Sequence, residues 1–440
     1  MPTATAATEL IRDLTWDALP EPIREQVLRS VLDLLGCAVA GTRTPAFLVA
    51  HAFSEVTFGT GTATVIDSTA RGAPAAAVLC NAFAANALDL DDGYRPLKGH
   101  PGSVVIPPAL TAAERTGASG ARFLAAVVAG YEIGLRTGLL VHQEYAYYHG
   151  TGSWGAAGAA AAVAALRELN AETCSVALGI AEFHAPMTPE MHSVDHPSML
   201  KDGIGWGAFN GYTAVDLAVA GVTAPPCLLA GNVDASADLG SRFLVGETYL
   251  KRYATCRWAQ PAIAAVGRCV RVLGCSADVV DQVVVGTFKE ASHLMVRRPR
   301  TSEEAQFSLP WAVACGIVRG SMGPDEVAAA DLDDPALLDH AARVEVVVDP
   351  TLDAAFPDRA LAWAEVRTFD GRTARSPTVP APGDADDPLP DDAVRAKFHQ
   401  LVDPVMGADH TALLERRVSE LPYAANLDGL LAALRGPATR

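Results

Sequence analysis

The stretch Val279-Val-Asp-Gln-Val-Val-Val285 belongs to the region where the 440-residue sequence changes its periodicity. Before it, apolar residues recur at helical spacing, whereas this run is β-branched and has the length of a strand. The segments 343–348 and 364–369 have the same character, and Asp370-Gly371 is a hairpin signal. From Asp391 onward helical spacing returns. The sequence therefore predicts a mostly α protein, with a large all-helical domain built from both chain ends plus a smaller α+β lid domain.

We place the domain boundaries at the two changes of periodicity. The predicted parts are residues 1–268 (helical domain), 269–392 (α+β lid domain) and 393–440 (C-terminal helices that rejoin the helical domain). Leu19-Pro20-Glu21-Pro22 opens the first long helix, because proline suits the first helical turn. Further helices are predicted over 73–88, 105–115, 120–140, 155–169, 172–180, 204–220, 261–273, 308–320, 391–402 and 411–434.

The composition narrows the class of protein. Half of the residues are hydrophobic and the net charge is −17, so we expect a large core, no nucleic-acid partner and no attachment to anionic membranes. The N-terminus lacks a basic stretch followed by an apolar one, which predicts a cytoplasmic protein. The longest uncharged stretch, 145–166, is too polar for a membrane span. None of the eight cysteines forms a CxxC pair, and buried free thiols are expected.

The segment Ala87–Gly102 concentrates candidate catalytic residues. Asp89, Asp92 and His100 lie within twelve positions, and the two aspartates share a helix face if the preceding helix persists. Pro101 keeps His100 out of the helical region, and Gly99 lets backbone approach a ligand. We therefore predict an imidazole fixed at a cleft. The alternative is a solvated acidic helix end followed by a turn.

Three further stretches carry candidate site residues. His149-Gly-Thr-Gly-Ser-Trp154 enters a small-residue helix, whose glycines suit either an anion on backbone N–H groups or close helix packing. Lys201 precedes a predicted helix beginning at Ile204, where a lone lysine is more often a surface charge. Arg257, after Cys256, is a candidate carboxylate clamp or part of a basic lead-in to a helix.

Taken in order, these stretches resemble the MmgE/PrpD family of 2-methylcitrate dehydratase, cis-aconitate decarboxylase and iminodisuccinate epimerase-like enzymes. Further matches are Leu-Asp-Leu-Leu-Gly36, Asp89-Leu-Asp-Asp, His100-Pro-Gly, Gln306-Phe-Ser-Leu-Pro and Ala396-Lys-Phe. The resemblance covers nearly the whole chain. It implies a homodimer without a metal or organic cofactor, an active site between the domains, and dehydration, decarboxylation or epimerisation of a small carboxylate or carbonyl substrate.

The resemblance also implies roles for individual residues. The predicted catalytic residues are Asp89, His100, His149 and Lys201. The predicted substrate-binding residues are Asp92, Tyr94, Lys98, Thr151, Cys256 and Arg257. No metal ligand is predicted.

The sequence departs from the family pattern at several positions. Gly93 and Tyr94 stand where the family often has threonine followed by histidine or tryptophan, Trp258 stands near a usual histidine, and Trp311 replaces a frequent tyrosine. We therefore expect a non-standard substrate, larger and less charged than a tricarboxylate. Two alternatives stay open: a metal-dependent all-α lyase or cyclase using the Asp89–Asp92 cluster, and a non-catalytic relative of the family.

Overall fold

Helices dominate the protein, as predicted for the mostly α class. The computed structural model describes residues 5–436. The N-terminal half is helical apart from a short hairpin of β1 (Thr60–Thr64) and β2 (Arg71–Gly72), which the sequence did not predict. Its helices are α1 (Ala6–Asp13), α2 (Glu21–Gly41), α3 (Pro45–Phe58), α4 (Pro74–Asn86), α5 (Pro101–Thr116), α6 (Gly120–Glu144), α7 (Thr151–Leu166), α8 (Ala171–Phe183), α9 (Glu190–Asp195), α10 (Ile204–Val219), α11 (Leu228–Gly231) and α12 (Val233–Ser236).

Small residues let the central helices approach closely. α7 packs against α5, α6, α8 and α10, and almost all of its residues are buried. A β-carbon at Gly130 would lie 2.9 Å from the backbone oxygen of Gly158, so the α6–α7 crossing requires a bare backbone. The alanine-rich and glycine-rich composition therefore positions α5 and α7, whose N-termini both border the site described below.

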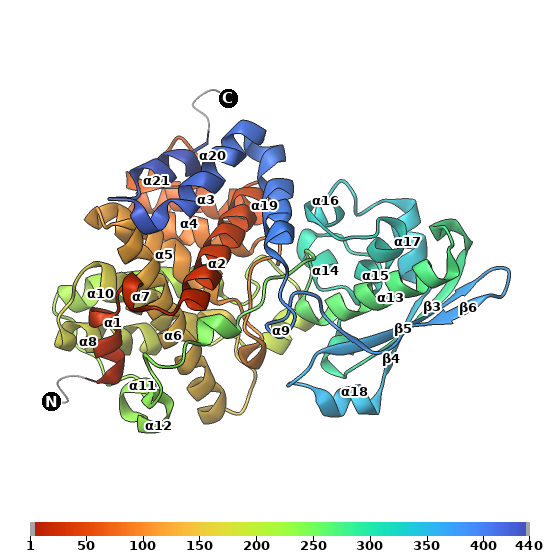
Figure 1. The fold of residues 1–440 in the computed structure, drawn as a ribbon, viewed down its shortest axis with the longest axis horizontal. Helices are drawn as coiled ribbons and strands as arrows, with labels where there is room; N and C mark the ends of the chain where they lie inside the picture. Colours follow the sequence, from red (N-terminus) through yellow and green to blue (C-terminus); the bar gives the residue numbers. More distant parts are fainter. Residues whose placement is uncertain (1–4, 437–440) are drawn as a thin grey trace.

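The C-terminal helices lie beside the N-terminal ones (Figure 1). They are α19 (Asp391–Met406), α20 (Ala408–Ser419) and α21 (Asp428–Leu434). α19 packs on α2, and the Lys397 ammonium of α19 lies 2.7 Å from the buried Asp33 carboxylate of α2. The sequence predicted one helix over 411–434; it is divided because Pro422 in the intervening turn at Leu421–Tyr423 lacks a backbone N–H group.

A mixed sheet occupies the segment between α12 and α19, to the right in Figure 1. Its strand order is β4-β3-β5-β6, with β4 parallel to β3, the other neighbours antiparallel and β7 paired with β5. α13 covers β5, and α15 packs between α13 and α17. The bounds are α13 (Gln260–Leu273), β3 (Val280–Thr287), α14 (Ser302–Gln306), α15 (Leu309–Val318), α16 (Pro324–Val327), α17 (Pro335–Ala342), β4 (Val344–Val348), α18 (Pro350–Ala355), β5 (Leu361–Thr368), β6 (Thr373–Arg375) and β7 (Val379–Pro380).

The three predicted strands and the Asp370-Gly371 turn are confirmed. Gly371 has φ 85°, the left-handed conformation that the turn between β5 and β6 requires. The division of the chain at residues 268 and 392 stays a prediction.

One helix, α6, is long and apolar enough to cross a membrane, and α2 with α3 would pass the same test if their 82° bend were ignored. Nearly all of the apolar part of α6 is buried inside the protein, as in the core helix of a globular fold. All eight cysteines are free, and Cys256 and Cys275 are half-buried rather than buried.

Candidate active site

Asp89 lies at the centre of a buried set of charges. Two ammonium groups flank its carboxylate: Lys251 Nζ lies 3.0 Å from Oδ2, and Lys201 Nζ lies 3.5 Å from Oδ1. Burial opposes ionisation of Asp89, but the charges of Lys201, Lys251 and His100 hold its pKa well below the usual value. We call Asp89, Asp91, His100, Lys201 and Lys251 the inner charge cluster.

The path of the chain after α4 places this carboxylate. The helix ends at Asn86, and Asp89 has φ 51°, a left-handed conformation that is uncommon for a residue with a side chain. The expectation that Asp89 and Asp92 share a helix face is therefore wrong, because the chain has left the helix before it reaches them.

Acceptor oxygens at both ring nitrogens of His100 favour its imidazolium form. Its Nδ1 lies 2.9 Å from the backbone oxygen of Asp92, which can only accept, and 3.3 Å from the Asp91 carboxylate. Its Nε2 lies 3.3 Å from Asp89 and 3.8 Å from Asp202. Burial alone would lower the pKa of His100, but the charge and hydrogen bond of Asp91, with the charge of Asp89, raise it to about 9.

Asp92 positions His100 through its backbone oxygen and does not line the cavity. Its Oδ1 accepts from the backbone N–H of Gly102 in the first turn of α5, and its Oδ2 accepts from the Tyr131 hydroxyl at 2.7 Å. Burial raises the pKa of Asp92 to about 7 despite these bonds. The structure thus gives Asp92 a positioning place, in contrast to the substrate contact predicted for it.

Lys201 also points away from the cavity. Its ammonium donates to the Asn86 backbone oxygen at 2.7 Å and to Gln306 Oε1 at 2.9 Å, in addition to its ion pair with Asp89. These contacts occupy its three donors. Lys201 therefore fixes the charge and position of Asp89.

A cavity opens beside Asp89 and His100. It is lined by Asp89, Lys98, His100, Tyr148, Glu190, Asp202, Tyr249, Cys256, Arg257, Trp258 and Phe307. Thr151, at the start of α7, contacts it indirectly: its hydroxyl donates to Asp202 at 3.1 Å and accepts from the His100 backbone N–H at 3.0 Å. The structure thus brings the predicted Asp89, Lys98, His100, Cys256 and Arg257 to one cavity.

Lys98 is the lysine that faces the cavity itself. Its Nζ lies 4.5 Å from the centre of the Tyr148 ring, and its one hydrogen bond within residues 5–436, to the Pro96 backbone oxygen, is long at 3.5 Å. Burial lowers the pKa of Lys98, while the nearby carboxyls of Glu290 and Glu190 oppose that shift. A carboxylate brought into the cavity would supply the counter-charge that Lys98 lacks.

Protein groups already occupy several of the N–H donors of Arg257, which leaves fewer for a ligand than we predicted. It donates to the backbone oxygens of Pro382 and Ala381, and its guanidinium lies 3.6 Å from Asp384. Arg95 binds the same Asp384 carboxylate at 3.2 Å. These bonds fix segment 381–386, which we call the mouth strap. The strap borders a second hollow, and this hollow shares four lining residues with the cavity: Lys98, Tyr249, Arg257 and Trp258.

Cys256 has no reactive thiolate. Burial raises its pKa far above the usual value, with the charge of Asp89 adding to the effect. A neutral thiol in the cavity wall can contact a substrate, but it is not an activated nucleophile.

Three residues expected at the site lie elsewhere. The His149 ring packs against Tyr147, with ring centres 3.9 Å apart, and does not line the cavity. The Tyr94 hydroxyl points to Glu247, 3.4 Å away, in a separate hollow beside α6. Trp311 is fully buried and donates to the Glu326 backbone oxygen. The three side chains are buried against partners outside the cavity.

Gly93 permits the close approach of Tyr249. The two residues pair through two backbone hydrogen bonds of 2.9 and 2.8 Å. A β-carbon at position 93 would lie 2.4 Å from the Tyr249 hydroxyl oxygen. The hydroxyl that glycine cannot supply at position 93 is therefore replaced, in nearly the same space, by the hydroxyl of Tyr249.

Asp89, Asp91 and His100 could hold a metal ion by distance alone. The chemistry of these donors does not fit one. Two lysine ammonium groups already neutralise Asp89, and His100 Nδ1 carries a proton toward a carbonyl oxygen, so a divalent cation would meet positive charge and lack a free imidazole ligand.

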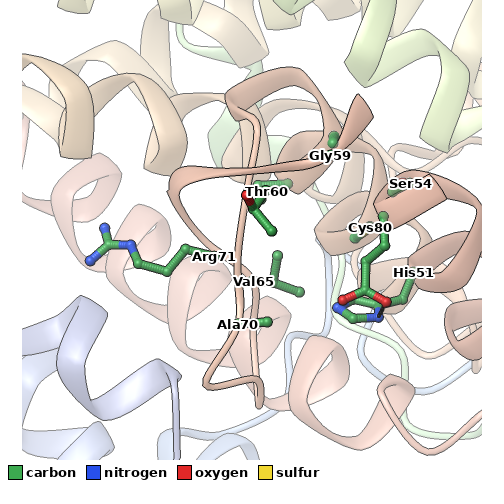
Figure 2. A pocket seen from close by; sticks show the side chains of 12 residues that line it. His51, Ser54, Gly59, Thr60, Val65, Ala70, Arg71 and Cys80 are labelled. Carbon is green, nitrogen blue, oxygen red and sulfur yellow. Dashed lines mark ion pairs between the residues drawn. The ribbon is translucent and has the colours of Figure 1, made fainter. Parts of the chain in front are cut away.

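Another hollow, between α3, α4 and the β1–β2 hairpin, is separate from this cavity (Figure 2). Its polar lining residues are His51, Ser54, Glu55, Thr60, Arg71 and Cys80. Burial raises the pKa of Cys80 to about 11, so its thiol is neutral at ordinary pH. None of its lining residues belongs to the inner charge cluster.

Sequence reasoning missed several residues of the site. The sequence analysis gave no role to Glu190, Asp202, Tyr249 or Lys251. Lys251 carried the only available signal, a lysine within an apolar and aromatic neighbourhood. Glu190, Asp202 and Tyr249 join the site only because the fold brings distant segments together.

Comparisons with known proteins agree with this arrangement. Sequence models of the MmgE/PrpD N-terminal and C-terminal domains match residues 6–237 and 253–421. The cis-aconitate decarboxylase-like protein oryM of Aspergillus oryzae is 23% identical, over 97% of this chain and 96% of its own length. The cis-aconitate decarboxylase of Aspergillus terreus is also 23% identical, over 97% and 94%. Because the family models together span most of the sequence, the chain belongs to the MmgE/PrpD family.

Proposed function

We propose that this protein is an acid/base enzyme that acts on a carbon next to a carboxylate or carbonyl group, with His100 as the proton donor. The observation that carries the proposal is the imidazolium of His100 in a cavity wall beside the unpaired ammonium of Lys98. The names of the relatives, a decarboxylase and a decarboxylase-like protein, support a lyase.

Decarboxylation suits these charges better than dehydration or epimerisation. Both of those begin with removal of a C–H proton, which needs a free base, whereas Asp89 is tied to two lysines and His100 is already protonated. Decarboxylation instead breaks the C–C bond to one carboxylate and releases CO₂. The electron pair stays on the carbon, conjugated with a neighbouring acid group, and takes a proton from Nε2 of His100.

The other residues would position the reactants. Lys98 binds the carboxylate that remains and stabilises the enolate-like charge formed beside it. Lys201 and Lys251 hold Asp89, and Asp89 aims Nε2 of His100. We propose that no metal or organic cofactor takes part, since each step uses side chains of this chain.

The substrate expected from the sequence remains a proposal. Trp258 lines both the cavity and the hollow at its mouth, with the Phe356 ring 5.7 Å away, which favours a larger and less charged molecule than a tricarboxylate. We expect 2-methylcitrate and cis-aconitate to be poor substrates. A kcat/KM of about 10⁴ M⁻¹s⁻¹ or more for either would contradict this expectation.

The test is a panel of carboxylates incubated with the purified protein in D₂O. Released CO₂ and deuterium at the former carboxyl-bearing carbon, read by NMR, would support the proposal. EDTA should leave the rate unchanged. Equal conversion by wild type and His100→Ala would refute the role of His100, and deuterium exchange without CO₂ would point to epimerisation or dehydration instead.

The homodimer also stays a proposal, together with the cytoplasmic location. Exposed apolar side chains gather on α3 and α10, where the rings of Phe53 and Trp206 lie 6.4 Å apart and Val56 is 89% exposed. A second copy of the chain could cover this face. Sedimentation of wild type and Val56→Asp tests it, with a shift toward monomer in the variant as the expected result.

A further inference from the structure

Two acidic side chains lie in the cavity wall next to the inner charge cluster. Glu190 opens α9, and Asp202 lies just before α10. Both are buried, with 5% and 3% of their surface exposed, and both line the cavity that contains His100. The mechanism above uses neither of them.

The surroundings of the pair favour a proton on Glu190. Asp202 Oδ2 accepts from the Thr151 hydroxyl at 3.1 Å and lies 3.8 Å from His100 Nε2. The buried Oε2 of Glu190 receives no N–H or O–H from the described residues, and the neighbouring acidic side chain in the cavity wall is that of Asp202. Two ionised carboxylates only accept, so a hydrogen bond between them needs one proton.

Gly150 makes room for this pair. A β-carbon at that position would lie 3.1 Å from Glu190 Oε2 and 3.0 Å from the Asp202 backbone oxygen. Gly150 is also the residue before α7, whose N-terminus favours negative charge on Asp202. The local backbone therefore favours Asp202 as the carboxylate and Glu190 as the acid.

The surrounding charges agree with that assignment. Burial raises the pKa of Glu190 well above its usual value, and the charges of Asp202 and Asp89 add to the shift, while Lys201 opposes it. Lys98, Tyr148 and Cys256 are the other titratable groups that sense its charge.

We propose that Glu190 and Asp202 share one proton and return it to His100 after each turnover. The inference rests on the proposed function, because each decarboxylation consumes one proton from His100. Asp202 passes a proton to Nε2 as it receives the proton of Glu190. Glu190 is then recharged by water that enters when product leaves. A small rotation of Asp202 would bring the 3.8 Å separation from Nε2 to hydrogen-bond length.

The first measurement does not depend on activity. Infrared spectra of protein labelled with ¹³C at the glutamate side-chain carboxyl should show a carboxylic acid band at neutral pH, and Glu190→Gln should remove its largest part. Glu303→Gln is the matched control, because Glu303 is also buried but lies in α14 outside the cavity lining. An unchanged band in Glu190→Gln would overturn the proposal.

The second measurement separates proton supply from the chemical step. The probe is the panel carboxylate that wild type converts fastest. Glu190→Gln keeps the size and a donor toward Asp202, so the first turnover should proceed at the wild-type rate, whereas steady-state kcat should fall by about tenfold or more. Glu190→Asp should recover part of the loss. Equal kcat in wild type and Glu190→Gln would overturn the proposal, as would an equal slowing of the first turnover.

The outcomes also distinguish this inference from the proposed function. A carboxylic acid band that depends on Glu190, in a wild type that converts no panel carboxylate, would support the shared proton and contradict the proposed reaction. Normal conversion without a band that depends on Glu190 would support the proposed reaction and contradict the shared proton.

Discussion

The inner charge cluster and the mouth strap both use ion pairs, but the two regions differ in their access to water. In the cluster, Asp89, His100 and Lys251 have side chains that are at most 9% exposed. At the strap, Arg95 is 34% exposed and its second partner, Asp386, is 81% exposed. Water and salt screen the strap but barely reach the cluster.

This difference in exposure separates two roles. The inner charge cluster holds the groups proposed for catalysis, and the mouth strap borders the entrance to the cavity. Charges in the cluster have no solvent to replace a lost partner, so each one depends on groups from distant parts of the chain. At the strap, Arg95 and Asp386 can exchange each other for water at little cost, whereas the side chains of Asp384 and Arg257 are only 14% and 11% exposed. The predictions below test this contrast in order of expected effect.

The largest effect is expected on catalysis when His100 is replaced. His100→Ala removes the proposed acid and should lower kcat by about 10²–10⁴-fold. The measurement is kcat for the best panel carboxylate, and Asp384→Asn at the strap is the comparison. Unaltered turnover in His100→Ala would place the proton donor elsewhere.

Asp89→Asn should strongly destabilise the fold, since two buried ammonium groups then lose their shared carboxylate. Breaking a buried ion pair on one side costs about 3–5 kcal/mol. Urea unfolding measures the change in free energy, and Asp386→Asn is the exposed control. If both variants unfolded at the same urea concentration, the proposed contrast between cluster and strap would be lost.

The pH dependence should follow His100. Its folded pKa of about 9 lies above the unfolded value near 6.5, so its ionisation stabilises the fold fully below that unfolded value. This contribution is lost as pH rises through about 9, and the rate should fall over the same range because the acid is consumed. A rate that increases steadily from pH 7 to 10 would indicate that His100 acts as a base.

The smallest effect is expected at the strap. Asp384→Asn weakens its bonds to Arg95 and Arg257, whose side chains are partly shielded from water. Because Arg257 keeps its bonds to two backbone oxygens, the stability should fall by about 1–3 kcal/mol, less than in Asp89→Asn, and KM should change more than kcat. Kinetics and urea unfolding of this variant test it, and a loss of kcat comparable with His100→Ala would assign Asp384 to the chemistry.

The secondary structure followed largely from local sequence. The β-branched runs became β3, β4 and β5, and most predicted helices formed within a few residues of their bounds, whereas α1, α3 and α17 were not predicted. The hairpin of β1 and β2 was missed because Thr60-Gly-Thr-Ala-Thr64 lacks the large apolar residues that mark a strand. The break before α21 was missed because apolar periodicity continues across Pro422.

The site was only partly predictable. His100 stood out because Gly99 and Pro101 fix the backbone around it, and Asp89 because it belongs to a cluster of aspartates that matches the family motif. The structure places both at the cavity. His149, Tyr94 and Trp311 were assigned from position in a motif, which does not tell which way a ring points. Their side chains turned toward aromatic or main-chain partners that no local pattern specifies.

The sequence by itself determined the family, the helical majority, the strands and the two residues around which the chemistry is proposed. Only the tertiary structure decided that Lys201 supports Asp89, that Tyr249 fills the space beside Gly93, and that Glu190 meets Asp202. The physical reason is the distance along the chain over which each effect acts. Backbone preference and periodicity act over a few residues, whereas the charge state of a buried group depends on partners that only folding brings within a few ångströms.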